Sequence, residues 1–208
     1  MYLVNAPFWL KKIYPKLHWN FSREEKCIYL TFDDGPTSSY TEWILETLKK
    51  HQAKASFFLI GKNIDAHPTL FSKIKNDGHA IGNHTYTHFN GWKHKTEAYL
   101  ENIEACQELC NTNLFRPPYG RISRSQIKAL SAKYKIVMWD VLSGDFDTSI
   151  SPKQCYENII KHTKNGSIIV MHDSEKAGIR MTETLPKILK HFSDRGYRFK
   201  AIPSEVLL

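Results

Sequence analysis

Residues 27–36 have the sequence CIYLTFDDGP, an apolar run that ends in two carboxylates and a turn. Its β-branched, aromatic and aliphatic residues are typical of a buried strand, which Gly35-Pro36 ends sharply. Asp33 and Asp34 therefore stand at a strand end, where parallel α/β folds carry their functional groups. Asp-Gly and Gly-Pro are also ordinary turn residues, so this stretch alone leaves a plain surface turn as an alternative.

Similar apolar runs recur along the chain and alternate with amphipathic segments. Strands are expected at 27–33, 55–60, 79–83, 114–116, 134–139, 167–171 and 198–202. Helices are expected at 41–51, 63–76, 95–110, 125–134, 152–163 and 182–193. This alternation predicts an α/β fold with a parallel sheet and helices outside it. A distorted (β/α) barrel of about seven parallel strands fits better than an open Rossmann sheet, because no glycine-rich phosphate loop follows the first strand.

Length and composition indicate one globular domain. The 208 residues suffice for a sizeable core, and 41% of them are hydrophobic and 24% charged. Residues 1–26 are expected to form an N-terminal extension packed on a main domain at 27–208. The formal net charge of +8 suits an anionic partner such as an acidic glycan or a membrane surface. The chain has no arginine-rich run or nucleic-acid motif, so no nucleic acid partner is expected.

Residues 8–14 mix aromatic, aliphatic and basic side chains and have helical character. Packing against the domain is the preferred interpretation, and peripheral contact with a membrane is the alternative. Pro7, Lys11 and Lys12 break the apolar stretch, so no secretory signal is recognised, and a location in the cytoplasm or at the inner face of the membrane is expected. The four cysteines are expected to be reduced thiols, and a monomer is the default.

Polar side chains follow five of the predicted strands. They are Asp33 with Asp34, His84 with His88, Arg116 with Tyr119, Asp145, and His172. Because the carboxyl ends of parallel strands meet on one face, these groups are expected to converge. Convergence favours a functional site over a surface turn.

His84 and His88 are four residues apart, which in a helical turn would place both rings on one face. Two imidazoles and a carboxylate are a common catalytic zinc set, and Asp34 is the natural third ligand. The alternative is a pair of ordinary surface or core histidines. The His-Glu-x-x-His motif of zinc proteases is absent. One divalent metal ion is expected, Zn²⁺ before Co²⁺, Ni²⁺ or Mn²⁺.

Four motifs together resemble those of the polysaccharide deacetylase family, also called the NodB-homology or carbohydrate esterase 4 family. They are Thr-Phe-Asp-Asp at 31–34, His-Thr-x-x-His at 84–88, Arg-Pro-Pro-Tyr at 116–119 and Val-Met-His at 170–172. The resemblance implies a NodB-homology catalytic domain at 27–208 in the form of a distorted (β/α) barrel that binds a divalent metal, usually zinc. It also implies removal of acetyl groups from N-acetylated sugars.

The resemblance further implies a role for each matching residue. Asp33 corresponds to the catalytic base, Arg116 to the arginine that orients this base, and His172 to the general acid. The backbone N–H of Tyr119 corresponds to a donor for the oxyanion, and the implied metal ligands are the three residues named above. Amide hydrolysis demands these parts on chemical grounds, because the carbonyl needs polarising, the water needs a base and the leaving amine needs an acid.

One family motif, Asp-x-x-Asp-Trp, is not matched. Aligned on Trp139, the chain has Leu142 in place of the first aspartate and Phe146 in place of the tryptophan. In the family, this first aspartate tunes the acid histidine. Asp140 and Asp145 are the candidates to replace it, and Asp145 is expected to take over part of the role. Trp139 is expected either in the core or as an apolar face for a sugar ring.

The leading function is therefore N-deacetylation of an amino-sugar glycan, whether chitin-like, peptidoglycan-like or carrying lipid-linked N-acetylglucosamine. A second is hydrolysis of another amide on the same scaffold, such as a deformylase reaction. A third is carbohydrate binding without activity, which the retained base and metal ligands argue against. The identity of the sugar and the length of the glycan are left open.

Overall fold

The computed structural model describes residues 2–204, and its centre is a parallel β-sheet. The strands within these residues are β1 (Cys27–Asp33), β2 (Ala55–Leu59), β3 (Ala80–Asn83), β4 (Leu114–Phe115), β5 (Lys135–Ile136), β6 (Val141–Leu142), β7 (Ser167–His172) and β8 (Arg198–Phe199). Seven are hydrogen-bonded in the order β5-β4-β3-β2-β1-β7-β6, and β8 pairs with β1 beside this path. All of these pairings are parallel, which confirms the expected α/β fold.

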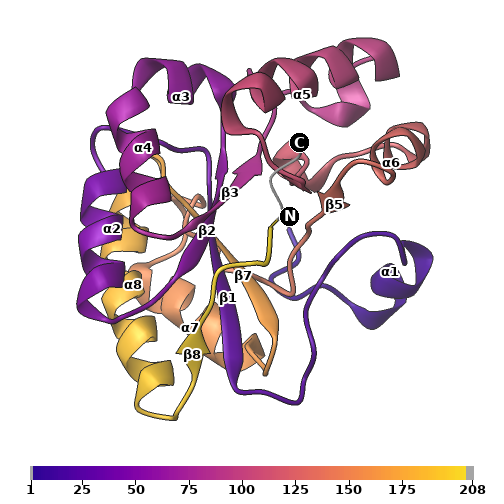
Figure 1. Cartoon of the computed structure of the whole chain (residues 1–208). Coiled ribbons are helices and arrows are strands. Elements are labelled where there is room, and N and C mark those ends of the chain that lie inside the picture. The colour runs from indigo at the N-terminus through magenta and orange to yellow at the C-terminus, as the bar shows by residue number, and fades with distance from the viewer. Residues whose placement is uncertain (1, 205–208) are drawn as a thin grey trace.

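Helices surround the sheet, which Figure 1 shows curled into a half-barrel. They are α1 (Phe8–Ile13), α2 (Thr41–Lys50), α3 (Gly61–Ala66), α4 (Pro68–Asn76), α5 (Thr96–Cys110), α6 (Arg124–Leu130), α7 (Pro152–His162) and α8 (Gly178–Ser193), with 3-10 turns η1 (Gly91–Lys93) and η2 (Pro118–Gly120). This architecture confirms the predicted distorted (β/α) barrel. No helix in the described part of the chain combines the length and the apolarity needed to cross a bilayer.

Strand β1 lies in the middle of the sheet because it is apolar on both faces. It has β2 and β7 as neighbours, and the consecutive residues Leu30 and Thr31, which point to opposite faces of the sheet, have no exposed surface. A parallel strand that is covered on both faces reads as a continuous apolar run, which is what residues 27–32 are. The end of β1 is therefore held rigidly where its two carboxylates begin.

The helix expected at 63–76 is two helices, α3 and α4, which meet at His67. Pro68 occupies the first turn of α4. A proline disfavours helical backbone at the residue before it and cannot donate to the preceding turn, so the chain leaves the helix at His67, whose φ and ψ are −134° and 57°. The expectation of one continuous helix was wrong for this reason.

The strand expected at 134–139 is shorter than predicted, since β5 ends at Ile136 and the next strand, β6, begins only at Val141. Residues 135–142 cross from one edge of the sheet to the other, with β5 at the start and β6 at the end. The N–H of Val137 donates to β4 at Phe115, and the N–H of Asp140 donates to β7 at Ile168. One chain segment thus links the two edge strands, and this crossing accounts for the interruption of the strand.

The N-terminal extension lies against the crossing segment 135–142. Four backbone hydrogen bonds of 2.7–3.1 Å connect Val4, Ala6 and His18 to it. Farther along the chain, Leu17 and Trp19 are buried in a core cluster with side chains of α5 and α6. The extension therefore covers the side of the barrel where the sheet edges meet.

The four cysteines are buried free thiols: Cys27, Cys106, Cys110 and Cys155. Burial raises the pKa of Cys155 to about 12, so its thiol stays protonated at neutral pH. The cysteines are packing residues of the core, in agreement with the expectation of reduced thiols.

Candidate active site

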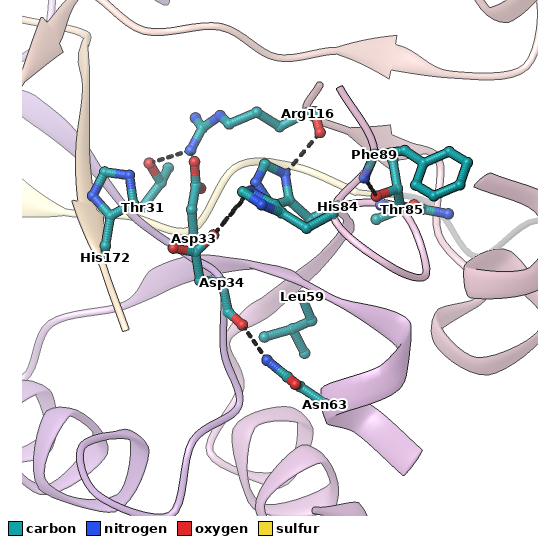
Figure 2. A network of polar contacts seen from close by, with 12 residues as sticks. Thr31, Asp33, Asp34, Leu59, Asn63, His84, Thr85, Phe89, Arg116 and His172 are labelled. Carbon is teal, nitrogen blue, oxygen red and sulfur yellow. Dashed lines mark hydrogen bonds and ion pairs between the residues drawn. The ribbon is translucent and has the colours of Figure 1, made fainter. Parts of the chain in front are cut away.

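The polar groups that follow the strands converge at the carboxyl edge of the sheet. Asp33 ends β1 directly opposite His172 at the end of β7. His84 follows β3, and Arg116 follows β4. Figure 2 shows Asp33 and Asp34 between the rings of His84 and His172. The convergence expected from the strand order is observed.

The three candidate metal ligands form a compact cluster. The ligand atoms of Asp34, His84 and His88 all lie within 4.8 Å of one another. Oδ1 of Asp34 is 3.3 Å from Nε2 of His88 and 3.8 Å from Nε2 of His84. The side chain of Asn63 donates to the backbone carbonyl of Asp34 at 2.7 Å, which holds this end of the cluster in place.

The two histidines share a site, but the segment between them is a tight loop and not the helical turn that their spacing would also suit. Thr85 and His88 have positive φ values of 67° and 58°. The N–H of Thr85 donates to Oδ1 of Asn83 at 2.8 Å, and Oγ1 of Thr85 accepts from the N–H of Phe89 at 2.9 Å. These side-chain hydrogen bonds replace those of a helix and close the loop around the cluster.

The chemistry of these three residues fits a divalent cation. Oδ1 of Asp34 is buried and has no hydrogen-bond partner within residues 2–204, so it keeps lone pairs that a cation would satisfy. Nδ1 of His84 lies 2.8 Å from the carbonyl oxygen of Arg116, which assigns the proton to Nδ1 and leaves Nε2 as a free lone pair. Burial lowers the pKa of His84 to about 4 and that of His88 below its usual value. Both rings are therefore neutral near pH 7, as ligation requires.

Asp33 is ionised and oriented by Arg116. Nη1 of Arg116 donates to Oδ1 of Asp33 at 2.6 Å and to Oγ1 of Thr31 at 2.8 Å, and the pair is buried. Burial alone would raise the pKa of Asp33, but the positive charge of Arg116, supported by that of His172, holds this pKa below its usual value. Asp33 is thus a fixed proton acceptor beside the metal cluster.

Arg116 also connects the site to the crossing segment. Its Nε donates to the carbonyl of Val137 at 3.1 Å, and its Nη2 donates to the carbonyl of Met138 at 3.0 Å. Its guanidinium lies 4.1 Å from the centre of the Phe58 ring. The Arg116 side chain therefore forms an ion pair with Asp33 and also donates hydrogen bonds to two backbone carbonyls beyond the end of β5. These contacts together fix the position of its guanidinium.

On the opposite side of the site, His172 is paired with Asp145. Nδ1 of His172 is 2.7 Å from Oδ1 of Asp145, which is fully buried. Burial alone would lower the pKa of His172, but the charge and hydrogen bond of Asp145 outweigh it and raise this pKa to about 9. Arg180 donates to the backbone carbonyl of Asp145 at 2.6 Å and fixes the loop. His172 is therefore a charged proton donor at neutral pH.

These groups open into one pocket of about 520 Å³. Tyr119, Trp139 and Phe146 line it together with the metal cluster. The Tyr119 ring lies 4.5 Å from that of His88, and the Phe146 ring meets the His172 ring edge-on at 5.1 Å. Trp139 was expected either in the core or on the pocket wall. It contributes to both, because it lines the pocket and also packs against the hydrophobic core cluster that includes residues of α6. The pocket thus has apolar walls around its polar floor.

Among the pocket residues that were not predicted from sequence are Tyr2, Arg121 and Lys176. Tyr2 reaches the pocket from the N-terminal extension and lies against the Phe146 ring at 4.9 Å between centroids. No local pattern announces such a contact, because it depends on how the extension folds back. Arg121 and Lys176 each lie within four residues of a predicted site residue, and that proximity was the one available signal.

With this geometry in place, comparison with known proteins is decisive. The sequence profile described as polysaccharide deacetylase matches residues 21–137. The chain belongs to the polysaccharide deacetylase family. A peptidoglycan-N-acetylglucosamine deacetylase of Bacillus cereus is 34% identical over 208 residues, which cover 96% of this chain and 74% of the relative. A peptidoglycan-N-acetylmuramic acid deacetylase of Bacillus subtilis is 30% identical over 189 residues, covering 86% of this chain and 71% of the relative.

Solved structures show the same polysaccharide deacetylase fold. A crystal structure of a peptidoglycan N-acetylglucosamine deacetylase in complex with an N-hydroxybenzamide superimposes with a TM-score of 0.88, at 32% identity and 95% coverage of both chains. A pseudoenzyme of carbohydrate esterase family 4 from Bacillus anthracis gives a TM-score of 0.76 at 25% identity, over 88% of this chain and 66% of the other. Family membership alone therefore does not establish catalysis, and the residues of the site must be tested.

Within the polysaccharide deacetylase family, this chain departs at the motif that follows Trp139. Leu142, at the position of the family aspartate, is buried and lines the pocket. Asp145 contacts His172, as described above. Asp140 instead faces the N-terminal extension, where it pairs with Lys11 and with Arg23 at 2.8 Å. Of the two carboxylates considered as replacements, Asp145 is the one beside His172.

Proposed function

We propose that this chain is a metal-dependent hydrolase that removes N-acetyl groups from amino-sugar glycans and releases acetate. The observation that carries the proposal is that ionised Asp33 and protonated His172 line the same pocket as the metal-ligand cluster. Two groups whose environments separate their pKa values provide a proton acceptor and a proton donor at the same pH. Membership of a family of glycan N-deacetylases supports the reaction class.

Asp34, His84 and His88 are the proposed ligands, with Zn²⁺ as the ion that a set of two imidazoles and one carboxylate favours. A divalent cation bound there polarises an acyl carbonyl and acidifies water. The side chain of Asp34 is suited to this role because it keeps a buried oxygen without a hydrogen-bond partner in residues 2–204.

The protein side chains then handle the protons. Asp33 accepts a proton from the attacking water as the oxygen of this water bonds to the acyl carbon. Arg116 keeps Asp33 ionised and aimed by its 2.6 Å hydrogen bond. As the carbon–nitrogen bond breaks, Nε2 of His172 gives its proton to the departing amine, while Asp145 holds Nδ1. The products are a free amino sugar and acetic acid, which ionises to acetate. Asp33 then loses its proton to solvent and His172 regains one from solvent, so both groups return to their starting states.

The remaining pocket residues are proposed to bind the substrate. The backbone N–H of Tyr119 is assigned to the oxyanion, since Tyr119 lies beside His88 on the pocket wall. The rings of Trp139 and Phe146 provide flat apolar faces, which suit the faces of sugar rings. Tyr2 supports the Phe146 ring from the N-terminal extension.

We propose peptidoglycan-type glycans with N-acetylglucosamine as the finer substrate class. The relatives cited above act on peptidoglycan according to their names. Arg121 and Lys176 also line the pocket and bring positive charge to it. Peptidoglycan strands carry carboxylates beside the acetylated sugars, and electrostatic complementarity favours such a partner over a neutral chitin-like chain.

The test measures acetate release by zinc-loaded protein from three substrates: purified peptidoglycan strands, chitin oligomers and an N-formylated sugar analogue. We expect acetate from peptidoglycan strands at a higher kcat/KM than from chitin oligomers. Formate release in excess of acetate would identify a deformylase. Binding of the glycans without release of either acid, in protein shown to contain the metal, would identify a non-catalytic binding protein and refute the proposal.

A further inference from the structure

Residues 3–13 expose a cluster of large apolar side chains. Leu3, Phe8, Trp9 and Ile13 are 57%, 71%, 58% and 53% exposed. They account for four of the seven large hydrophobic side chains exposed in residues 2–204. Single exposed apolar residues are normal on a protein surface, but a group of them on one short segment marks an interaction surface.

The exposure is a property of how α1 is seated. Leu10 and Tyr14 of this segment pack inward against the core cluster beside α5 and α6. Trp9 and Ile13 are four residues apart and therefore share a face of the helix, and both are turned to solvent. A surface helix with one apolar face normally presents polar residues on the face turned to solvent. Helix α1 has apolar residues on its solvent face as well as on its core face. Within the described residues, nothing covers the exposed Trp9 and Ile13 side chains on that solvent face.

The segment is also held rigidly at the edge of the molecule. Figure 1 shows α1 on the side of the sheet opposite α2, α4 and α8. Lys11 on the helix pairs with buried Asp140, and backbone hydrogen bonds fix Val4, Ala6 and His18 on either side. The exposed side chains are therefore preorganised, which lowers the entropy lost on binding.

Positive charge predominates around α1, and Asp140, the carboxylate that pairs with Lys11, is buried. Residues 2–23 and residues 111–139, which include α6, contain lysines and arginines but no aspartate or glutamate. The two stretches are neighbours, since Lys16 and Arg124 line the same shallow hollow between α1 and α6. Exposed aromatic and aliphatic side chains among cations are the composition of segments that lie in the interface of an anionic bilayer.

We propose that α1 and its flanking residues are a docking surface for an anionic lipid membrane. Phe8, Trp9 and Ile13 enter the headgroup region, and Lys12 and Lys16 contact anionic headgroups. A second copy of the chain is the less favoured occupant, because two such faces would repel each other through their excess of positive charge. Tyr2 of the same extension lines the pocket, so docking brings the pocket close to the membrane surface.

The test is co-sedimentation of the full chain with vesicles of phosphatidylcholine alone and with added phosphatidylglycerol. We expect binding to the anionic vesicles that weakens with salt and falls at least about tenfold in the Phe8→Ser/Trp9→Ser double variant. Ile179→Ser is the control for Ile13→Ser. Both isoleucines are exposed, Ile13 by 53% and Ile179 by 68%, but Ile179 belongs to α8, far from α1 in sequence. Ile13→Ser should weaken binding, and Ile179→Ser should leave it unchanged.

Acetate release from a soluble glycan is a control for folding and should be the same in all of these variants. Failure of the wild-type chain to sediment with anionic vesicles would overturn the proposal. Equal binding by the Ile13→Ser and Ile179→Ser variants would do so as well. A concentration-dependent dimer that is abolished by Phe8→Ser/Trp9→Ser, in a chain that does not bind vesicles, would assign the surface to self-association.

Discussion

Both carboxylate oxygens of Asp145 bind His172: Oδ1 lies 2.7 Å from Nδ1 of the ring, and Oδ2 accepts from the backbone N–H at 2.7 Å. The two hydrogen bonds fix the orientation of the His172 ring and stabilise its protonated form. The hydrogen bond from the backbone N–H positions the Asp145 carboxylate, and the hydrogen bond to Nδ1 leaves Nε2 as the nitrogen that donates a proton to the substrate. Asp145 reaches this place from a loop three residues beyond Leu142.

The first prediction concerns Asp145→Asn and the pH dependence of turnover. His172 must be protonated to donate, so turnover of the wild type should fall as pH rises through its raised pKa of about 9. Asparagine removes the negative charge that stabilises the imidazolium, so the basic limb of kcat should move towards lower pH. A pH profile of kcat measures this shift. An unchanged basic limb would show that Asp145 does not tune His172.

The second prediction concerns Asp33→Asn. Asparagine preserves the size of the side chain but does not accept a proton from water, so turnover should fall by roughly a hundred- to ten-thousand-fold. The substitution also leaves the buried guanidinium of Arg116 without its counter-charge, and we expect a loss of about 3–5 kcal/mol in the free energy of unfolding. Denaturant titration and acetate release below the melting temperature separate the two effects. Near wild-type turnover would place the base elsewhere.

The third prediction concerns metal content. His84→Ala removes a ligand whose other ring nitrogen is held by the Arg116 carbonyl, so the variant should no longer retain a stoichiometric divalent ion after dialysis. Added Zn²⁺ should raise the melting temperature of the wild type but not that of the variant. His94→Ala, in an exposed histidine outside the cluster, is the matched control. Undiminished stoichiometric zinc in His84→Ala would contradict the assignment.

The parts of this molecule that local patterns encode were predictable. The end of β1 follows from an apolar run closed by Gly35-Pro36, and the parallel arrangement of the strands then predicts that Asp33 and His172 lie at the same edge of the sheet. The conformation of residues 84–88 was not predictable, because a four-residue spacing suits a helical turn and a tight loop equally. The side-chain hydrogen bonds of Thr85 decide between them, and they form only in the folded chain.

Long-range contacts account for what the patterns missed. The strand expected at 134–139 ends at Ile136, and beyond it the side chain of Arg116, far away in the sequence, donates to the carbonyls of Val137 and Met138. Tyr2 enters the pocket only because the extension folds back along 135–142. Neither contact leaves a mark on the composition or periodicity of the segments that make it, so neither was predicted.

The fourth prediction concerns Gly82→Ala on β3. A Cβ atom at this position would lie 2.3 Å from Cδ1 of Phe58, the ring that supports the Arg116 guanidinium. The ring must shift, so we expect the free energy of unfolding to fall by about 1–3 kcal/mol and kcat to fall as Arg116 is disturbed. Denaturant titration and acetate release measure both. Combining Gly82→Ala with Phe58→Leu makes room and should recover part of the stability, and no recovery would contradict this mechanism.

The fifth prediction concerns Asp140→Asn. This variant distinguishes the role of Asp140 from that of Asp145, the other carboxylate considered as a partner of His172. Asp140 is buried and binds Lys11, Arg23 and Ser167, and although burial alone would raise its pKa, these partners hold it below its usual value. A lowered pKa means that the ionised form stabilises the fold above the unfolded-state pKa and that this contribution is lost as pH falls through the folded-state pKa.

Asp140→Asn should therefore lower the free energy of unfolding by about 1–3 kcal/mol at pH 7, since Lys11 and Arg23 remain partly solvated when their partner is lost. The difference from the wild type should vanish in acid, where Asp140 is protonated in both states. Trypsin should cut faster at Lys11 and Lys12, because the extension loses its anchor. The basic limb of kcat should not move, since Asp140 faces away from His172. If this limb shifted as in Asp145→Asn, Asp140 would be part of the machinery that tunes His172.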